Sequence, residues 1–371
     1  MSVEKGKRLD SLDALRGLTM FWITGGATLV SALALLVTGD KNAWLCQQMT
    51  HVPWAGLHIY DLIFPTFLFI TGVTFPFSTA KRLERGDSKA AIAWNILRRA
   101  LVLIALGAVY EEIQKLDWAH FRVWSVIGRI GLVWGVAALM TLCCRLRTCV
   151  AVALVILVGW WLFYRWVPAP GGEWGVNYLF NPKDAFARWF DTQYLTTAHR
   201  GEGGLTSIAM LPTAFLGIWA GQYLRLAKDG LTPGLKTLTM LGAALAMIAL
   251  GCLWAWPSWG CPVIKNCWSG SFVLVAGGIS LALLAIFYWL IDVKGWKAWS
   301  FYFRVIGMNA IAIYLSVKFF PLRPTGRMFL GALVTVSNSP AWFEVVSSFG
   351  QLAVGWLILY FCYRKKIFFK V

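Results

Sequence analysis

Residues 269–291 read SGSFVLVAGGISLALLAIFYWLI, a run of 23 residues without a charged side chain. A helix needs about 20 mostly apolar residues to cross the hydrocarbon core of a bilayer. Similar runs recur along the chain and are separated by polar segments. We therefore predict an all-α fold, a polytopic transmembrane helix bundle of about ten spans in a single domain over residues 1–371. The spans are expected near 15–37, 55–78, 92–110, 123–143, 149–167, 206–224, 237–256, 269–291, 302–320 and 343–363.

The composition supports a membrane location for the whole chain. Of its 371 residues, 58% are hydrophobic and only 14% are charged, whereas soluble domains have about 25% charged residues. The net charge is +17, but the basic residues form short clusters between apolar runs, such as 81–85 and 364–366. This spacing is typical of loops that orient a membrane protein. Membrane lipids are thus expected partners and nucleic acid is not, while the sequence leaves a homodimer open.

The distribution of basic residues also predicts the orientation. Lysine and arginine are concentrated in segments 1–14, 79–91, 144–148, 225–236, 292–301 and 364–371 and in their flanks. The alternating segments 38–54, 111–122, 168–205, 257–268 and 321–342 are poorer in basic residues. Cytoplasmic loops are enriched in Lys and Arg, so we predict both chain ends in the cytoplasm. The first span lacks a cleavage site, and we expect a multi-pass protein of the inner (plasma) membrane.

Segment 168–205 is the one long loop, on the outer side, and a loop of that length is usually functional or a lid. The eight cysteines do not have the spacing of metal ligands, and we predict no metal. Three of them (Cys46, Cys261 and Cys267) fall in outer segments, where one disulfide could form.

A histidine and an aspartate near the second span are the strongest candidates for chemistry. His51 precedes this span and Asp61 lies inside it. In a straight helix they would stand about 15 Å apart, so contact requires a break, which Pro53 and Gly56 could supply. His58 is closer to Asp61 in sequence and on the same helical face. A buried carboxylate that orients an imidazole would make a general base or a nucleophile. Alternatively, His51 is an interfacial loop residue and Asp61 a packing group.

Other polar residues lie inside or beside the apolar runs, where they are costly and therefore candidate site residues. Arg129 lies inside the fourth span and Arg122 begins it; pairing of Arg129 with Asp61 is the structural alternative. Asp13 suits a helix start, which leaves Arg16 free to meet a phosphate. Asn309 places an amide inside the ninth span, where an interhelical hydrogen bond is the commoner role.

Several of these residues stand in motifs that occur in a specific order. The motifs are 8–17 (RLDSLDALRG), 51–56 (HVPWAG), 61–73 (DLIFPTFLFITGV), 125–131 (SVIGRIG), 203–208 (GGLTSI), 265–274 (KNCWSGSFVL) and 307–311 (GMNAI). In this order they resemble the heparan-alpha-glucosaminide N-acetyltransferase family, specifically its bacterial members. The resemblance covers about residues 8–363.

The resemblance implies that acetyl-CoA, a co-substrate, binds from the cytoplasmic side and that an amino sugar or glycan is acetylated on the other side. His51 matches the active-site histidine and Asp61 the nearby carboxylate, so both are predicted to be catalytic. Two departures concern the acceptor: the first span has no asparagine at 22–27, and Trp54-Ala55-Gly56 replaces Trp-Asn-Gly. Heparan specificity is therefore not carried over.

The remaining assignments follow from this hypothesis. Cofactor-binding residues are expected to be Arg16, Arg98, Arg99 and Asn309, and substrate-binding residues Arg122, Arg129, Glu202 and Trp268. The alternative function is a transporter or flippase for a glycan or lipid-linked sugar. Transporters often contain inverted repeats and paired broken helices, and the sequence shows neither.

Overall fold

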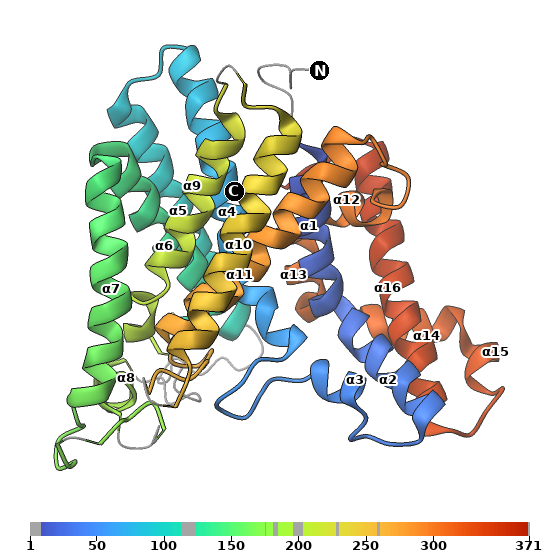
Figure 1. Ribbon diagram of the computed structural model, residues 1–371. Helices are drawn as coiled ribbons and strands as arrows, with labels where there is room; N and C mark the ends of the chain where they lie inside the picture. Colours follow the sequence, from blue (N-terminus) through green and yellow to red (C-terminus); the bar gives the residue numbers. More distant parts are fainter. Residues whose placement is uncertain are drawn as a thin grey trace.

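The computed structural model describes residues 9–112, 124–174, 176–180, 185–195, 203–227, 230–257 and 260–369. Within these ranges the chain forms helices and no β-strand, apart from one isolated bridge between Pro168 and Ala185 (Figure 1). Eight helical segments there are long and apolar enough to cross a membrane. The predicted all-α polytopic membrane bundle is confirmed.

The long segments are continuous helices or helices joined by a short irregular turn. α1 (Asp10–Phe21) and α2 (Ala27–Thr38) form one span through a π-turn at Trp22–Gly26, where Gly25 has φ +134°. α11 (Gly270–Phe287) continues through a π-turn at Tyr288–Val293. The others are α4 (Ile63–Glu84), α5 (Lys89–Glu112), α6 (Val126–Cys143), α7 (Leu146–Trp166), α10 (Pro233–Trp254) and α16 (Pro340–Arg364).

Two predicted spans are shorter or divided. The span expected at 206–224 is α9 (Leu211–Arg225), which follows a 3₁₀ turn at Leu205–Ser207. The span expected at 302–320 is broken at Asn309 into α12 (Phe301–Met308) and α13 (Ala310–Phe319). Asn309 leaves helical geometry with φ −127° and ψ 38°, and its side chain binds another segment described below. The short helices are α3 (Trp44–Gln48), α8 (Phe186–Tyr194), α14 (Leu322–Phe329) and α15 (Gly331–Val334).

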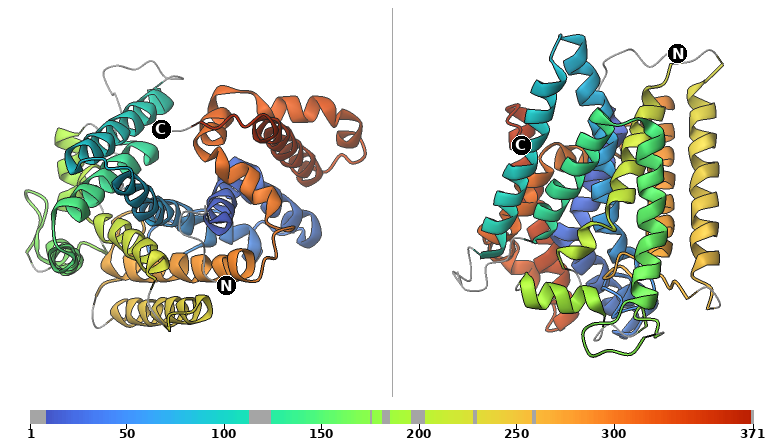
Figure 2. Two further views of the ribbon diagram at one scale, coloured as in Figure 1. Left: turned by 90° about the horizontal axis from the view of Figure 1, so that it is seen from above. Right: turned by 90° about the vertical axis from the view of Figure 1, so that its left-hand side faces the viewer.

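The two membrane faces of the bundle differ in what they carry. α1 begins and α16 ends at one face, which also holds the turns after α4, α6, α9 and α11 (Figures 1 and 2). We call it the basic face, because Arg85, Arg145, Arg225 and Lys294 lie in or beside these turns. The opposite face holds α3, α8 and the loop before α11. This alternation agrees with the predicted placement of both chain ends on one side.

Glycines allow α1 and α12 to pack with their backbones in contact. A Cβ on Gly17 would lie 1.7 Å from the carbonyl oxygen of Phe303, and a Cβ on Gly307 would lie 1.8 Å from that of Asp13. Gly217 of α9 is likewise pressed against the backbone of α4. Small residues of this kind bring helices together in a membrane, where lipid supplies no hydrophobic drive.

Candidate active site

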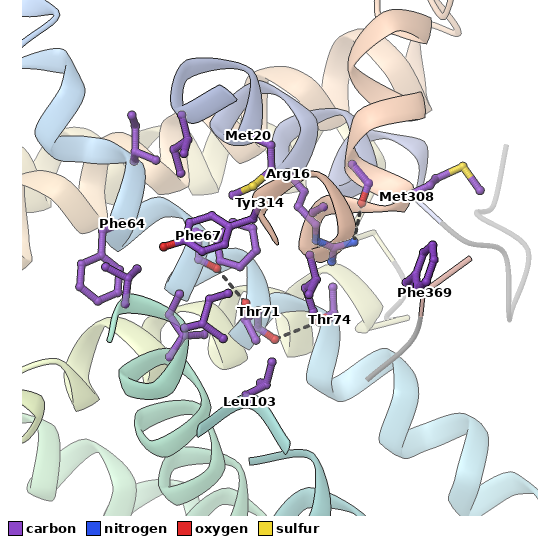
Figure 3. Close-up of a pocket in the computed structure, with 18 of the residues that line it drawn as sticks. Arg16, Met20, Phe64, Phe67, Thr71, Thr74, Leu103, Met308, Tyr314 and Phe369 are labelled. Atoms are coloured by element: carbon purple, nitrogen blue, oxygen red, sulfur yellow. Dashed lines mark hydrogen bonds between the residues drawn. The ribbon is translucent and has the colours of Figure 1, made fainter. Parts of the chain in front are cut away.

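One cavity of about 600 Å³ lies inside the bundle, and its lining includes His51 near the opposite face and Arg16 toward the basic face. Its wall comes from α1, α4, α5, α6, α12 and α13, and Figure 3 shows the side chains that point into it. The lining residues in α4 and in the turn before it extend from Tyr60 to Thr74. That distance is about 20 Å at 1.5 Å per residue, a large part of the roughly 30 Å hydrocarbon core.

At the end of the cavity near the opposite face, the imidazole of His51 binds the carboxylate of Asp61. His51 Nδ1 lies 2.7 Å from Asp61 Oδ1. The other carboxylate oxygen, Oδ2, accepts hydrogen bonds from the backbone amides of Val52 and His58, each at 3.2 Å. Asp61 is buried, and both of its carboxylate oxygens bind groups of the 51–58 loop.

This contact is formed because residues 51–58 are not helical. Gly56 has φ +123°, a conformation that suits glycine, and its amide donates to the carbonyl of Val263 at 2.8 Å. The chain turns back here, so that His51 reaches Asp61 ten residues later. His58, the nearer histidine in sequence, lies instead 3.0 Å from the Thr50 carbonyl through its Nδ1 and fastens the same loop.

The contact with Asp61 determines what His51 can do chemically. A neutral imidazole that donates its Nδ1 proton to Asp61 keeps the lone pair on Nε2. The His51 side chain is 41% exposed, lines the cavity and packs 4.7 Å from the ring of Tyr60. Nε2 is therefore equipped to take a proton or to attack a carbonyl carbon.

A lysine completes this group, and sequence reasoning missed it. Lys265 Nζ lies 3.2 Å from His51 Nδ1 and 3.5 Å from Asp61 Oδ1. Lys265 comes from the loop before α11, 214 residues from His51 along the chain. Its position at the start of the 265–274 motif was the only signal in the sequence.

The end of the cavity toward the basic face carries two arginines. Arg16 Nη1 lies 3.2 Å from Asp13 Oδ1 and 3.5 Å from the Gly307 carbonyl oxygen. The guanidinium of Arg99 packs 4.6 Å from the ring centre of Trp134. Both arginines line the cavity, whereas Arg98 is exposed and does not line it.

Asn309 lies beside this end rather than in the cavity wall. Its Nδ2 donates to the Ile367 carbonyl at 3.1 Å, and its Oδ1 accepts from the Phe369 amide at 3.0 Å. The amide thus holds the segment after α16, and Phe368 and Phe369 of that segment line the cavity (Figure 3). Any effect of Asn309 on a ligand would pass through these residues.

Two residues predicted to bind substrate lie behind the cavity wall. Arg129 is buried with its guanidinium 5.1 Å from the ring of Phe64, and the charge of Asp191 in α8 acts on it. Trp268 is buried too, with φ +52°, and its Nε1 donates to Thr213 Oγ1 at 3.2 Å. Arg122 and Glu202 lie outside the described residues.

Asp191 connects the outer loop to the bundle. Its Oδ1 accepts from the Leu205 amide at 3.1 Å, just before α9, and a Cβ on Gly203 would lie 1.4 Å from its Oδ2. Burial raises the pKa of Asp191 to about 6. This carboxyl group is therefore a conformational anchor whose charge depends on pH near neutrality.

The outer cysteines, among which the sequence left one disulfide open, do not form one in the part of the chain that the structure describes. All eight cysteines are free thiols, including Cys46, Cys261 and Cys267. Burial raises the pKa of Cys267 to about 12, so this thiol stays protonated. In the part of the chain that the structure describes, no group of three or more His, Cys, Asp or Glu side chains could hold a metal ion.

Comparison with known proteins tests the family resemblance suggested by the motifs. No protein-family model matches the chain. It is 27% identical to the heparan-alpha-glucosaminide N-acetyltransferase of Homo sapiens and 26% identical to that of Mus musculus, in each case across 98% of this chain. The chain spans about 60% of the length of these two relatives. The resemblance predicted from the motifs is thus confirmed: over nearly its whole length, the chain is similar to the heparan-alpha-glucosaminide N-acetyltransferases.

Proposed function

We propose that this protein is a membrane acetyltransferase that moves an acetyl group from acetyl-CoA at the basic face to an amino sugar or glycan at the opposite face. The observation that carries the proposal is one cavity with Arg16 and Arg99 toward one end and His51 at the other. Such a cavity lets a donor and an acceptor meet without either crossing the membrane. The similarity to two N-acetyltransferases supports the same reaction class.

The basic end suits the nucleotide part of the donor. Phosphate oxygens form strong charge-assisted hydrogen bonds with guanidinium groups, and Arg16 and Arg99 present two of these. Beyond them the wall is mostly apolar, with Met20, Phe67 and Ile130. A thioester on a flexible arm would extend along this section toward His51.

The His51 end suits acyl transfer. In direct transfer, the acceptor amine attacks the thioester carbonyl carbon while His51 Nε2 takes the amine proton. The C–S bond breaks, and the CoA sulfur leaves with the electron pair and is then protonated. In the two-step route, Nε2 attacks the carbonyl carbon and the CoA sulfur leaves with the electron pair of the broken C–S bond. The acceptor amine then displaces the acetyl group from Nε2 and gives up its proton to the freed Nε2. Both routes need a neutral imidazole held by Asp61, and both remain part of the proposal.

The positive-inside rule assigns the basic face to the cytoplasm, and we place the protein in the inner (plasma) membrane. The donor would then enter from the cytoplasm, and the acceptor would be acetylated on the far side. The opening beside His51 would hold the acceptor, with Arg129 and Trp268 supporting the wall from behind.

One observation favours the alternative of a glycan or lipid-linked sugar transporter. Two spans are discontinuous: α1–α2 at Gly25 and α12–α13 at Asn309. Broken helices of this kind often surround transported substrates. The His51–Asp61 pair and the similarity to acetyltransferases favour the enzyme.

Purified protein in proteoliposomes tests the proposal with labelled acetyl-CoA outside and glucosamine inside, or the reverse. Acetyl transfer predicts labelled N-acetylglucosamine together with release of one CoA per product. His51→Ala should lower turnover at least about a thousandfold while CoA still binds. His58→Ala is the matched control and should retain most activity, because its ring contacts the Thr50 carbonyl and does not line the cavity. Full turnover in His51→Ala would end the catalytic role, and sugar movement without CoA release would establish the transporter.

A further inference from the structure

Lys265 is held against the His51–Asp61 pair by a loop built for that placement. The Ser269 hydroxyl accepts the Ile264 amide at 3.0 Å and donates to the Pro262 carbonyl at 2.7 Å. The indole of Trp160 donates to the Cys267 carbonyl at 2.8 Å. These bonds fix the loop on both sides of Lys265.

The same loop is joined to the segment that carries His51. The Gly56 amide donates to the Val263 carbonyl at 2.8 Å, two residues before Lys265. The Lys265 side chain is only 12% exposed. The position of its ammonium group is thus set by the surrounding fold and is not that of a flexible surface side chain.

The groups that face His51 come from two elements: Tyr60 and Asp61 from the 3₁₀ turn Ile59–Leu62, and Lys265 from the loop before α11. The carboxylate of Asp61 lies 2.7 Å from Nδ1, the ammonium of Lys265 lies 3.2 Å from the same atom, and the phenol ring of Tyr60 packs on the imidazole. A carboxylate alone at this distance would favour a positively charged imidazolium. An imidazolium has no lone pair on Nε2 and is neither a base nor a nucleophile.

Resting on the proposed function, we propose that Lys265 is a positioning residue that keeps His51 neutral by balancing the charge of Asp61. The ammonium stands where it repels a second positive charge on the ring. Asp61 is therefore free to hold the Nδ1 proton by a hydrogen bond without drawing a proton onto Nε2. The simpler alternative is a salt bridge between Lys265 and Asp61 that only stabilises the loop.

Chemical modification separates these alternatives without relying on acetyl transfer. Diethyl pyrocarbonate reacts with neutral imidazole, so the rate of His51 carbethoxylation against pH, followed by peptide mass spectrometry, reports the charge of the ring. In Lys265→Met we expect the midpoint of this curve to move to higher pH by one unit or more. At a pH below the midpoint, His51 should then be modified at least tenfold more slowly than in the wild type. Lys265→Arg should keep the wild-type midpoint, and His58 in the same samples serves as the internal control.

A double variant sharpens the test. In Lys265→Met/Asp61→Asn both charges are gone, and the midpoint should return toward that of the wild type. If acetyl transfer is observed, the acidic limb of its pH–rate profile should shift in Lys265→Met in the same direction. An unchanged His51 midpoint in Lys265→Met would overturn the inference and leave the salt bridge. If that variant fails to fold, Lys265→Gln provides the same measurement. If the wild type shows no acetyl transfer but the His51 midpoint still shifts in Lys265→Met, the proposed function is refuted and the role of Lys265 is not.

Discussion

Arg98 and Arg99 are neighbours in α5, yet Arg99 lines the cavity and packs on Trp134 whereas Arg98 is exposed. Adjacent residues on a helix point about 100° apart, so one turn of α5 supplies both a cavity residue and its own control. The pair allows a direct test of where the donor binds.

Arg99→Ala should weaken acetyl-CoA binding, because a charge-assisted hydrogen bond to phosphate is worth roughly 1.5–3 kcal/mol, about ten- to a hundredfold in affinity. Arg98→Ala should leave affinity near that of the wild type. Calorimetric titration of each variant with CoA measures the difference. Equal losses in the two variants would mean that the arginines act through general charge and not through the cavity.

Asp61→Asn should lower kcat by about a hundredfold or more and leave the KM for acetyl-CoA nearly unchanged. The amide no longer fixes the Nδ1 proton of His51, and a general base typically contributes about 10²–10⁴ in rate. Steady-state kinetics with varied donor separates the two constants. Asp292→Asn is the control, since that carboxylate accepts the Asp10 and Ser11 amides at the basic face. A rise in KM alone would instead make Asp61 a binding group.

Thr71 and Thr66 of α4 test whether the middle of the cavity holds solvent and ligand. Thr71 lines the cavity, whereas Thr66 is buried and hydrogen-bonded to Ser280 at 2.8 Å. A small water-soluble thiol reagent should label Thr71→Cys but not Thr66→Cys, and CoA should slow the labelling. Mass spectrometry of the α4 peptide distinguishes these sites from the native cysteines. Labelling of Thr71→Cys that CoA does not affect would place the donor elsewhere.

The close packing of α1 on α12 predicts a large cost for one methyl group. Gly17→Ala would drive a Cβ to 1.7 Å from the Phe303 carbonyl oxygen, and such overpacking typically costs about 1–3 kcal/mol. Gly159→Ala in α7 has open space and should be neutral or slightly stabilising. Thermal unfolding in one detergent, followed by tryptophan fluorescence, compares the two. Similar melting temperatures would show that α1 and α12 are not held in contact.

The raised pKa of Asp191 predicts a pH-dependent stability. Burial raises its pKa from 3.8 to about 6, so the folded protein binds this proton more tightly than the unfolded chain does. The resulting stabilisation is complete below about pH 4 and is lost as the pH rises through 6, at most about 3 kcal/mol. Asp191→Asn should therefore melt higher than the wild type at pH 7.5, and the difference should shrink by pH 5. A constant difference across this range would exclude the buried carboxyl as its cause.

Apolar runs predict most of this fold because lipid demands a minimum length of apolar helix. Eight of the predicted spans are long helical segments, from α1–α2 to α16. The break at Asn309 was not predicted, since residues 302–320 are mostly apolar and hydropathy does not report backbone geometry. At the break, the Asn309 side chain donates to the Ile367 carbonyl, and this partner is too distant in sequence for a local pattern to reveal.

The site was predictable only where its partners are near in sequence or recur in a motif. His51 and Asp61 are ten residues apart, with Pro53 and Gly56 between them as signals of a turn. Lys265 approaches them through the tertiary fold, so spacing could not reveal it. Arg129 illustrates the same difficulty: the sequence suggests Asp61 as its partner, whereas the structure places the charge of Asp191, from the long outer loop, close enough to act on it.

The glycine contacts also restrict which helices could separate to let a large ligand enter the cavity. α1 and α12 meet backbone to backbone at Gly17 and Gly307, and a Cβ on Gly107 of α5 would lie 2.7 Å from the Gly128 amide nitrogen of α6. Each pair must therefore move as one body. Between the bodies, α5 meets α13 through the rings of Tyr110 and Tyr314, 4.7 Å apart. Aromatic side chains can rotate without a shift of the backbone, so we expect the bundle to open at the contact between Tyr110 and Tyr314.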